Sequence, residues 1–415
     1  ALVEDERRFS KEHRSLRVFK FSQGKSVLTT VGEEWGRQRK LLREAFSPKR
    51  VAGYLNLMRS AAVEANDAFF PSGTGRGIPF DPSVYASHIT MDVMLRVLFS
   101  EKISPLESAS IRESVLNLSA IGQRMLQWPV VPARWIPFPG RNQLMEHDHR
   151  LRTPIRERIE RRRSATALAG ATPVDLIEAM LLAEEGETTV GVSAEQQRLT
   201  PKEVEDNCIT LFGAGFETSA SALTWWMGFM ALHPEHMQRA RAEIRDAMGS
   251  GWAQRELEPA SLSSLHFLEA SLKEAMRLRP PAVAVFNRVA NQNFTLMGVP
   301  FQRGDIVSGS IWTLHHDKRW FPEPNAFNPA RFMPDAPPIP RGAFLPFGAG
   351  PHVCLGQHFA MLEMKLVAAL LLSQFEWAFP PGEKLPDPRV DVTIKPARPF
   401  QLVACRIDPA ERADF

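Results

Sequence analysis

Residues 347–356 read Phe-Gly-Ala-Gly-Pro-His-Val-Cys-Leu-Gly and place one cysteine, Cys354, in a turn that opens onto an apolar helical segment. Glycine and proline favour tight turns whose backbone amides can converge on one atom. A helix beginning at Leu355 would direct its amide dipoles at the sulfur and favour the thiolate. A lone cysteine is more often a small buried hydrophobe. This turn instead favours a thiolate ligand for a metal that accepts soft donors.

Composition and charge restrict the class of protein. The chain has 415 residues, 44% hydrophobic and 23% charged, as is typical of a globular protein with a large core. A net charge of +3 gives no argument for nucleic-acid binding. Cys208, Cys354 and Cys405 are odd in number and far apart, so we expect no disulfide framework and a cytoplasmic location. No stretch approaches the about 18 consecutive apolar residues that a membrane span requires.

Helical periodicity dominates the chain, and no linker separates independent domains, which predicts one mainly α domain over residues 1–415. Helices are expected over residues 33–47, 50–70, 81–99, 106–127, 141–163, 173–184, 201–232, 234–248, 262–279 and 355–375. Short strands at 293–296, 306–308 and 399–405 predict a small sheet region rather than a doubly wound sheet.

Residues 128–140 form an apolar connection between two expected helices, with Trp128, Trp135, Phe138 and four prolines. Two interpretations stay open for this segment. It is either exposed, as a substrate entrance or a lip that touches a membrane, or folded onto the core, as aromatic connections commonly are.

Residues 212–219, Phe-Gly-Ala-Gly-Phe-Glu-Thr-Ser, lie inside the helix expected over 201–232. Each glycine in a helix interior costs about 1 kcal/mol relative to alanine, so two of them need a compensating reason. Gly213 and Gly215 would let a flat ligand approach the backbone, and Thr218 can hydrogen-bond to the carbonyl of Ala214 and open the helix locally. The alternative is a close crossing of two helices at small residues.

The pattern Phe-x-x-Gly-x-x-x-Cys-x-Gly at 347–356 resembles the haem-binding loop of the cytochrome P450 family. The resemblance implies a mainly α P450 fold with haem b between the long central helix and the cysteine loop. It also implies that Cys354 is the axial ligand of the iron and that Phe347 packs beside the sulfur. Backbone amides of the turn, which contains Gly348 and Gly356, would then donate to the thiolate.

The pattern Ala-Gly-x-Glu-Thr at 214–218 resembles the oxygen-binding stretch of the family's central helix. The resemblance implies that Ala214 and Gly215 lie over the haem. It also implies that Thr218 hydrogen-bonds dioxygen or a water beside it, and that Glu217 passes protons inward from solvent. Heterolytic cleavage of the O–O bond consumes two protons, so an acid beside a hydroxyl suits this step.

Glu274 and Arg277 are spaced as Glu-x-x-Arg, and Arg331 follows in Pro-Ala-Arg-Phe. Alone, such a helical pair is usually an exposed ion pair of small effect. Together the two motifs resemble the P450 charge network, which implies a buried structural cluster behind the haem loop. Removing one member would then strand the others in a medium of low dielectric constant.

Trp35 and Arg39 resemble the family's Trp-x-x-x-Arg helix, which implies that they bind a haem propionate. Arg288 and His352 match further propionate contacts of the family. A Trp and an Arg spaced in this way are otherwise more often a pair on the surface. Only 34 residues precede Trp35, so we expect part of the family's amino-terminal segment to be absent.

The motifs occur in family order along nearly the whole chain, so the resemblance implies a haem-thiolate monooxygenase. The reaction would insert one oxygen atom of O2 into a hydrophobic small molecule such as a fatty acid, a terpenoid or a steroid-like compound. Family alignment places six apolar residues around the substrate: Leu211, Ala214, Ala282, Val283, Val285 and Phe286. The alternatives are a peroxide-driven peroxygenase and a non-catalytic haem-binding sensor or carrier.

Electrons would come from a separate ferredoxin or flavodoxin with its NAD(P)H-dependent reductase, because only 61 residues follow Cys354. Four basic residues on helices that border the thiolate side in the family are candidates for docking this partner: Arg37, Lys40, Arg43 and Lys365. The alternative is that they are ordinary surface cations.

Overall fold

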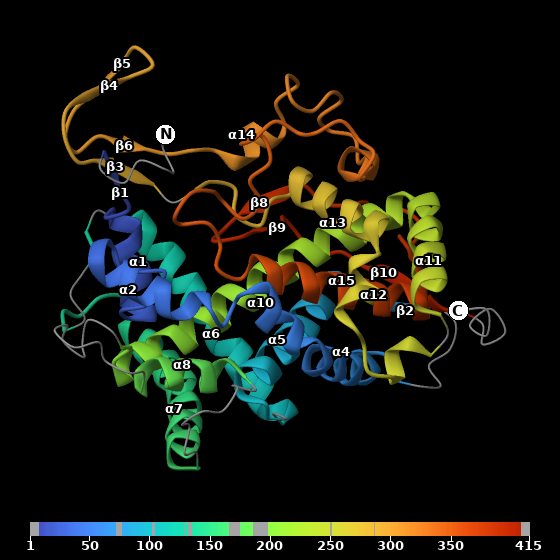
Figure 1. The fold of residues 1–415 in the computed structure, drawn as a ribbon, viewed down its shortest axis with the longest axis horizontal. Helices are drawn as coiled ribbons and strands as arrows, with labels where there is room; N and C mark the ends of the chain where they lie inside the picture. The colour runs from blue at the N-terminus through green and yellow to red at the C-terminus, as the bar shows by residue number, and fades with distance from the viewer. Residues whose placement is uncertain are drawn as a thin grey trace.

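Helices make up most of the chain in the computed structural model (Figure 1). The structure describes residues 8–71, 77–101, 104–128, 130–131, 135–165, 175–185, 198–249, 251–285 and 287–407. The α-helices are α1 (Arg14–Gln23), α2 (Gly32–Arg43), α3 (Pro48–Gly53), α4 (Leu55–Phe69), α5 (Pro82–Phe99), α6 (Pro105–Gln127), α7 (Arg141–Ala165), α8 (Leu176–Glu185), α10 (Pro201–Leu232), α11 (Pro234–Met248), α12 (Pro259–Ser263), α13 (His266–Leu278), α14 (Ile311–His315) and α15 (Gln357–Gln374). Two 3-10 helices are η1 (Trp252–Gln254) and η2 (Pro329–Phe332).

Most expected helices are confirmed, with differences at turns. The helix expected over 33–47 ends at Arg43, and those expected over 50–70 and 262–279 are each divided in two. Tyr54 marks the first division, because its amide bonds the carbonyl of Val51 and closes a tighter turn between α3 and α4. Helix α1 was not expected, since only three of its ten residues are buried and its apolar signal is weak.

The strands form small antiparallel sheets, as expected, rather than a doubly wound sheet. They are β1 (Phe9–Ser10), β2 (Ile78–Phe80), β3 (Arg288–Ala290), β4 (Phe294–Leu296), β5 (Val299–Phe301), β6 (Ile306–Val307), β7 (Phe375–Ala378), β8 (Pro388–Val390), β9 (Ile394–Pro396) and β10 (Leu402–Arg406). Their orders are β1-β3-β6 and β2-β10-β7, with β4-β5 and β8-β9 as two-stranded hairpins. The β4-β5 hairpin projects from the molecule, at the upper left of Figure 1.

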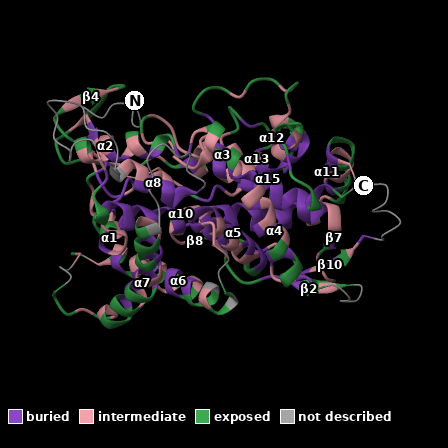
Figure 2. Cartoon of the chain, turned by 60° about the horizontal axis from the view of Figure 1, so that its bottom comes forward, coloured by how far each residue is buried: buried purple, intermediate pink, exposed green. Residues whose placement is uncertain are grey.

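Helix α10 runs through the centre of the molecule and is enclosed by α5, α7, α13 and α15. Figure 2 shows α10, α5 and α15 mostly in the colour of buried residues. The helix begins at a capping box in which Thr200 and Glu203 each bond the other's backbone amide, followed by Pro201 at the first helical position. Buried apolar residues from Val18 to Ala404 form one contiguous cluster. That the whole chain is a single domain stays a prediction.

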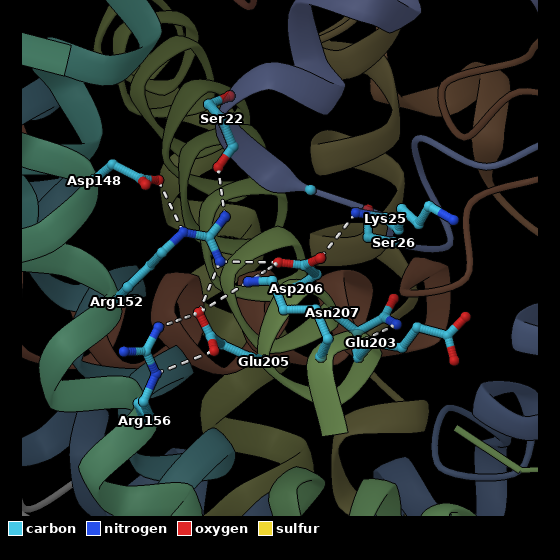
Figure 3. A network of polar contacts seen from close by, with 12 residues as sticks. Ser22, Lys25, Ser26, Asp148, Arg152, Arg156, Glu203, Glu205, Asp206 and Asn207 are labelled. Atoms are coloured by element: carbon cyan, nitrogen blue, oxygen red, sulfur yellow. Dashed lines mark hydrogen bonds and ion pairs between the residues drawn. The ribbon is translucent and has the colours of Figure 1, made fainter. Parts of the chain in front are cut away.

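A buried charge network fixes α7 to the amino-terminal turn of α10 (Figure 3). Arg152 of α7 donates to Asp148, to Glu205 and Asp206 of α10, and to the carbonyl of Ser22 in α1, at 2.8–3.0 Å. The hydrogen bonds from Arg152 to the three acids are charge-assisted. They offset the free-energy cost of removing these charged groups from water. It therefore sets the position of α10, on which the candidate site is built.

Across the described part of the chain, no helix has both the length and the apolar composition needed to cross a bilayer.

Candidate active site

The turn that carries Cys354 is held by its own backbone. The amide of Cys354 donates to the carbonyl of Phe347 at 2.8 Å, and the amide of Val353 donates to the carbonyl of Gly350 at 3.0 Å. Gly348 and Gly350 both have a φ of +73°, a conformation that side-chain-bearing residues rarely adopt. The glycines are therefore required by the turn, and the turn fixes the direction of the sulfur.

The expected thiolate is not favoured by the protein alone. Helix α15 begins at Gln357, two residues later than expected, and burial raises the pKa of the Cys354 thiol, although the Gly356 amide and Arg39 oppose this. The cysteine is nevertheless classed as exposed. Both facts fit a side chain inside the molecule that faces a space wide enough for solvent. A metal ion, if bound to this sulfur, would stabilise the thiolate by its positive charge.

Residues 213–218 expose one face of α10 in the middle of an otherwise buried helix. Leu211 and Phe212 before this stretch and Ser219 and Ala220 after it are buried, whereas Ala214 is exposed. A Cβ atom added to Gly213 would meet no atom within 4 Å. A helix enclosed on all sides has no reason to expose its centre unless it borders an internal space. We call residues 213–218 of α10 the notch.

Thr218 donates its hydroxyl to the carbonyl of Ala214 at 2.8 Å, as expected. The expected local opening of the helix is wrong, because α10 is α-helical without a break from Pro201 to Leu232. Gly215 was expected to let a flat ligand approach the helix backbone, but the structure gives it a different role. A Cβ atom on Gly215 would lie 3.1 Å from the Cε and Sδ atoms of Met94 in α5. The missing side chain of Gly215 therefore permits close packing of α10 on α5, which is the alternative interpretation of the two glycines. Gly213 is the one that borders open space.

The carboxylate of Glu217 does not extend freely into solvent. Three side chains hold it in place. Lys395 of β9 lies 2.8 Å from its Oε1, Thr393 donates to the same oxygen at 3.2 Å, and Ser119 of α6 donates to Oε2 at 3.5 Å. Lys395 is partly exposed, so the carboxylate connects the surface hairpin β8-β9 with the notch. Sequence reasoning missed Lys395, since nothing local links it to a helix almost 180 residues earlier.

Trp35 and Arg39 of α2 contact the cysteine turn, and their expected role as propionate ligands stays a prediction. The rings of Trp35 and His352 lie 4.0 Å apart between centroids, and Nη2 of Arg39 donates to the carbonyl of Val353 at 2.6 Å. The Nε atom of Arg39 is buried and has no hydrogen-bond partner within the described residues. A buried unpaired donor at this position calls for an acceptor that the chain does not provide.

Positive charge gathers around His352. Burial, followed by the nearby charges of Lys11, Arg288 and Arg39, lowers the pKa of His352 to about 3. The imidazole is therefore neutral at pH 7 and surrounded by three cations. Lys11 was missed by sequence reasoning, because it belongs to no motif and reaches the site only through the fold, with its Nζ 5.8 Å from the centre of the Trp35 ring.

The expected charge network is assembled and buried. Arg277 donates to both carboxylate oxygens of Glu274 at 2.7 and 2.8 Å, and Arg331 approaches Glu274 at 3.3 Å. Arg277 also donates to the carbonyls of His315, Pro324 and Ala326 at 2.7–3.0 Å. The network ties α13 to the segment that leads to the cysteine turn.

The residues expected around a substrate differ in how far they are buried. Leu211 is buried in the core cluster, whereas Ala214 and Ala282 are exposed and Val283 and Val285 are partly buried. Backbone bonds from Val285 to Gly309 and from Trp312 to Val283 hold the segment in an extended form. Phe286 lies outside the described residues.

Comparison with known proteins decides the family. Residues 1–404 match the family model described as Cytochrome P450. The chain is a cytochrome P450. It is 31% identical to the cyclooctat-9-en-7-ol 5-monooxygenase of Streptomyces melanosporofaciens, with 87% of this chain and 74% of that protein covered. It is 28% identical to the putative cytochrome P450 132 of Mycobacterium bovis, with 92% and 80% covered.

Solved structures confirm the P450 fold. A retinoic-acid-bound cyanobacterial P450, CYP120A1, superposes with a TM-score of 0.80 at 25% identity, covering 98% of this chain and 86% of that one. The haem domain of cytochrome P450DA superposes with a TM-score of 0.84 at 22% identity and the same coverage. The fold and the class of enzyme, a P450 monooxygenase, therefore agree with the sequence prediction.

The residues present in this P450 fit the haem of its family. Cys354 is a free cysteine whose sulfur could bind an iron ion, and Gly213 borders open space on α10. The unpaired Nε of Arg39 and the cations around His352 match the two carboxylates that a haem carries. The donor set and the charge of this site thus suit a flat, dianionic, iron-bearing cofactor.

Glu363 of α15 is a buried acid that sequence reasoning did not single out. Both of its carboxyl oxygens and the hydroxyl of Ser219 in α10 lack a hydrogen bond of good geometry within the described residues. Burial raises the pKa of Glu363 to about 8, and an interaction with Ser219 opposes this only in part. The carboxyl group is therefore mostly protonated at pH 7. The signal was an acid inside an apolar helical segment.

The apolar connection at 128–140 is folded onto the core in one part and exposed in another, and its role as an entrance or a membrane-touching lip stays a prediction. Trp128 and Phe138 pack against the core, with their rings 5.5 Å apart, whereas Trp135 is 79% exposed. A surface groove of about 500 Å³ lies between this segment and Ile121 and Arg124 of α6. Residues 129 and 132–134 lie outside the described part.

Proposed function

We propose that this P450 binds haem b with Cys354 as the iron ligand and oxidises a hydrophobic small molecule with O2. The observation that carries the proposal is the exposed position of Ala214 in the middle of buried α10, one turn before the hydroxyl of Thr218 that bonds its carbonyl. A thiolate-ligated haem supplies the activation of O2 when it is bound and reduced. The chain's own residues orient that cofactor, exclude water and handle protons.

Four residues are proposed to bind the haem carboxylates: Trp35, Arg39, Arg288 and His352. Arg39 brings an unpaired Nε, and neutral His352 brings an imidazole that can donate one hydrogen bond. Lys11 joins this set because it lies among the same cations. Two carboxylates would offset the local positive charge, which is costly in a partly buried pocket without them.

Thr218 and Glu217 are proposed to deliver protons. The Thr218 hydroxyl already has an acceptor in the Ala214 carbonyl, so its oxygen can accept a hydrogen bond from a water in the notch. Glu217 links the notch to the partly exposed Lys395, which gives protons a route from the surface. The carboxylate must leave Lys395 or exchange a proton through a water beside it to complete the route.

The substrate class is proposed from the side chains that the family resemblance places around a substrate. Ala214, Ala282, Val283 and Val285 bring no charge, which favours an apolar substrate such as a terpenoid, fatty acid or steroid-like molecule. The names of similar proteins point the same way, with cyclooctat-9-en-7-ol for one relative and bound retinoic acid for one solved structure.

Electrons are proposed to come from a separate ferredoxin or flavodoxin with its NAD(P)H-dependent reductase. Lys40 and Arg43 of α2 are exposed and suit an acidic partner. Arg37 and Lys365 do not, because Arg37 pairs with Glu203 at 2.5 Å and the buried Lys365 pairs with Glu269 at 2.7 Å. A cytoplasmic location stays a prediction.

The iron ligand is tested by the absorption spectrum of the reduced protein with carbon monoxide. We expect the band of thiolate-ligated haem, and we expect Cys354→Ser to lose it. A band at the position of imidazole-ligated haem in the unmodified protein would contradict the assignment of Cys354.

The proton-delivery role is tested by Thr218→Ala, with product formed per NAD(P)H consumed as the readout. We expect this ratio to fall several-fold. Thr224→Ala is the matched control, since Thr224 makes the same bond to the carbonyl four residues earlier, at 2.7 Å, but is buried away from the notch. An unchanged ratio in Thr218→Ala would refute the role. Faster turnover with hydrogen peroxide than with a reductase would favour the peroxygenase alternative.

A further inference from the structure

A cluster of two histidines and one glutamate lies at the junction of α10 and α11, apart from the candidate active site. His233 caps the end of α10, Pro234 starts α11, and Glu235 and His236 follow in its first turn. Within the described residues, the imidazole nitrogens and the carboxylate oxygen of these three side chains all lie within 4.8 Å of one another. Nδ1 of His233 is 3.2 Å and Nε2 of His236 is 4.0 Å from Oε1 of Glu235.

We propose that His233, Glu235 and His236 form a binding site for a divalent transition-metal ion such as Zn2+. Imidazole and carboxylate are ligands that Zn2+ accepts, at about 2.0–2.2 Å, and three protein ligands leave a fourth position for water. The three donor atoms need shifts of only about 1 Å to reach such distances. The three ligand residues are consecutive in the chain apart from Pro234, whose ring fixes its φ angle. Little backbone freedom is therefore lost when a metal ion binds.

Surrounding residues hold the two imidazoles in place. The ring of Phe327 lies 5.4 Å from that of His233 and 5.8 Å from that of His236, and it stacks on Phe229 of α10 at 5.1 Å. The carbonyl of Phe327 is within hydrogen-bonding reach of the His236 imidazole. A backbone carbonyl that accepts from one ring nitrogen leaves the other nitrogen to a metal, which is the usual outer contact of a metal-binding histidine.

The backbone of the cluster is also fixed. The carbonyl of His233 accepts from the amides of His236 and Met237 at 3.0 and 3.3 Å. The positive end of the α11 dipole opposes the binding of a cation here. Glu235 therefore has to contribute its negative charge, and the site should depend on the carboxylate as strongly as on the imidazoles.

A metal ion here would link α10 and α11 to the segment that carries Phe327. That segment joins the charge network, since the amide of Asn328 donates to Glu274 at 2.9 Å and the carbonyl of Ala326 accepts from Arg277 at 3.0 Å. Ligand binding to the folded state alone stabilises it. We therefore expect Zn2+ to raise the Tm by about 3 °C when its concentration is about 100 times the Kd.

The test is titration of the haem-loaded protein with ZnCl2 by calorimetry, with Zn K-edge absorption for the ligand set. We expect one Zn2+ per chain and scattering from nitrogen and oxygen, including two imidazoles. His236→Gln and Glu235→Gln should each weaken binding by about tenfold or more. His149→Ala is the matched control, because His149 is exposed on α7 and outside the cluster.

Two results would overturn the proposal. The first is equal Zn2+ affinity in His236→Gln, Glu235→Gln and the unmodified protein, with circular dichroism showing that all are folded. The second is a Zn–S distance of about 2.3 Å, which would place the ion on a cysteine such as the exposed Cys405. Both readouts are independent of turnover, so they stand whether or not the monooxygenase proposal holds.

Discussion

Replacing Glu363 by glutamine should change how the stability of the protein depends on pH. Glutamine is nearly isosteric with a protonated glutamate and cannot ionise. Burial raises the pKa of Glu363 from its ordinary value of 4.5 to about 8, which corresponds to about 5 kcal/mol at about 1.36 kcal/mol per pH unit. The side chain is fully buried, so exposure to solvent does not reduce this figure.

The sign follows from which state keeps the proton. Below pH 4.5 the carboxyl group is protonated in both the folded and the unfolded chain, and the stabilising effect of the neutral group is complete. As the pH rises towards 8, the unfolded chain releases the proton while the folded chain retains it, so unfolding becomes more favourable. Glu363→Gln avoids this loss, and the variant should exceed the unmodified protein in stability by up to about 5 kcal/mol at pH 8.

The assay is urea unfolding of both haem-loaded proteins at several values between pH 5 and pH 8. Taking the difference between the two proteins cancels every other titrating group, and similar stability at pH 5 shows that packing is unchanged. Glu376→Gln is the control, because Glu376 lies on the surface in an ion pair with Arg241. The infrared C=O band of a protonated carboxyl should be absent from Glu363→Gln. A difference in stability that stays constant from pH 5 to pH 8 would refute the reasoning.

Two further predictions concern arginines. Arg39→Met should accelerate loss of haem to an apoprotein acceptor by about tenfold or more, since a hydrogen bond to a charged group contributes about 1.5–3 kcal/mol. Arg43→Met is the control, because Arg43 is exposed on the same helix and its replacement should not change the rate. Equal rates of haem loss in the two variants would show that Arg39 does not bind the haem. Arg277→Ala should lower the free energy of unfolding by about 3–5 kcal/mol because it leaves Glu274 buried without its partner. Arg319→Ala, which breaks an exposed pair, should change the stability far less, and a similar loss in both variants would contradict the buried network.

Local patterns were enough to predict the fold and the main chemistry. The glycine-rich turn at 347–356 and the bond from Thr218 to the carbonyl of Ala214 both depend on φ values and on side-chain-to-backbone bonds within a few residues. Such features are determined by neighbours in the chain. The bond from Thr218 to Ala214 could therefore be predicted from spacing alone.

Contacts between distant segments were decided only by the tertiary structure. Lys395 pairs with Glu217 and Lys11 joins the cations around His352 because packing brings separate elements together, and no spacing in the sequence records this. The same holds for Gly215, which has no side chain and so leaves room for Met94 of α5 to pack against α10.

The sequence by itself determined which groups are present: a cysteine in a tight turn, an acid beside a hydroxyl on the central helix, and a set of charges in family order. Only the tertiary structure decided the environment of each group. Ionisation depends on desolvation and on nearby charge, which are properties of the packed molecule. Burial makes the Cys354 thiol and the Glu363 carboxyl prefer their neutral forms, and no reading of neighbouring residues could have fixed that.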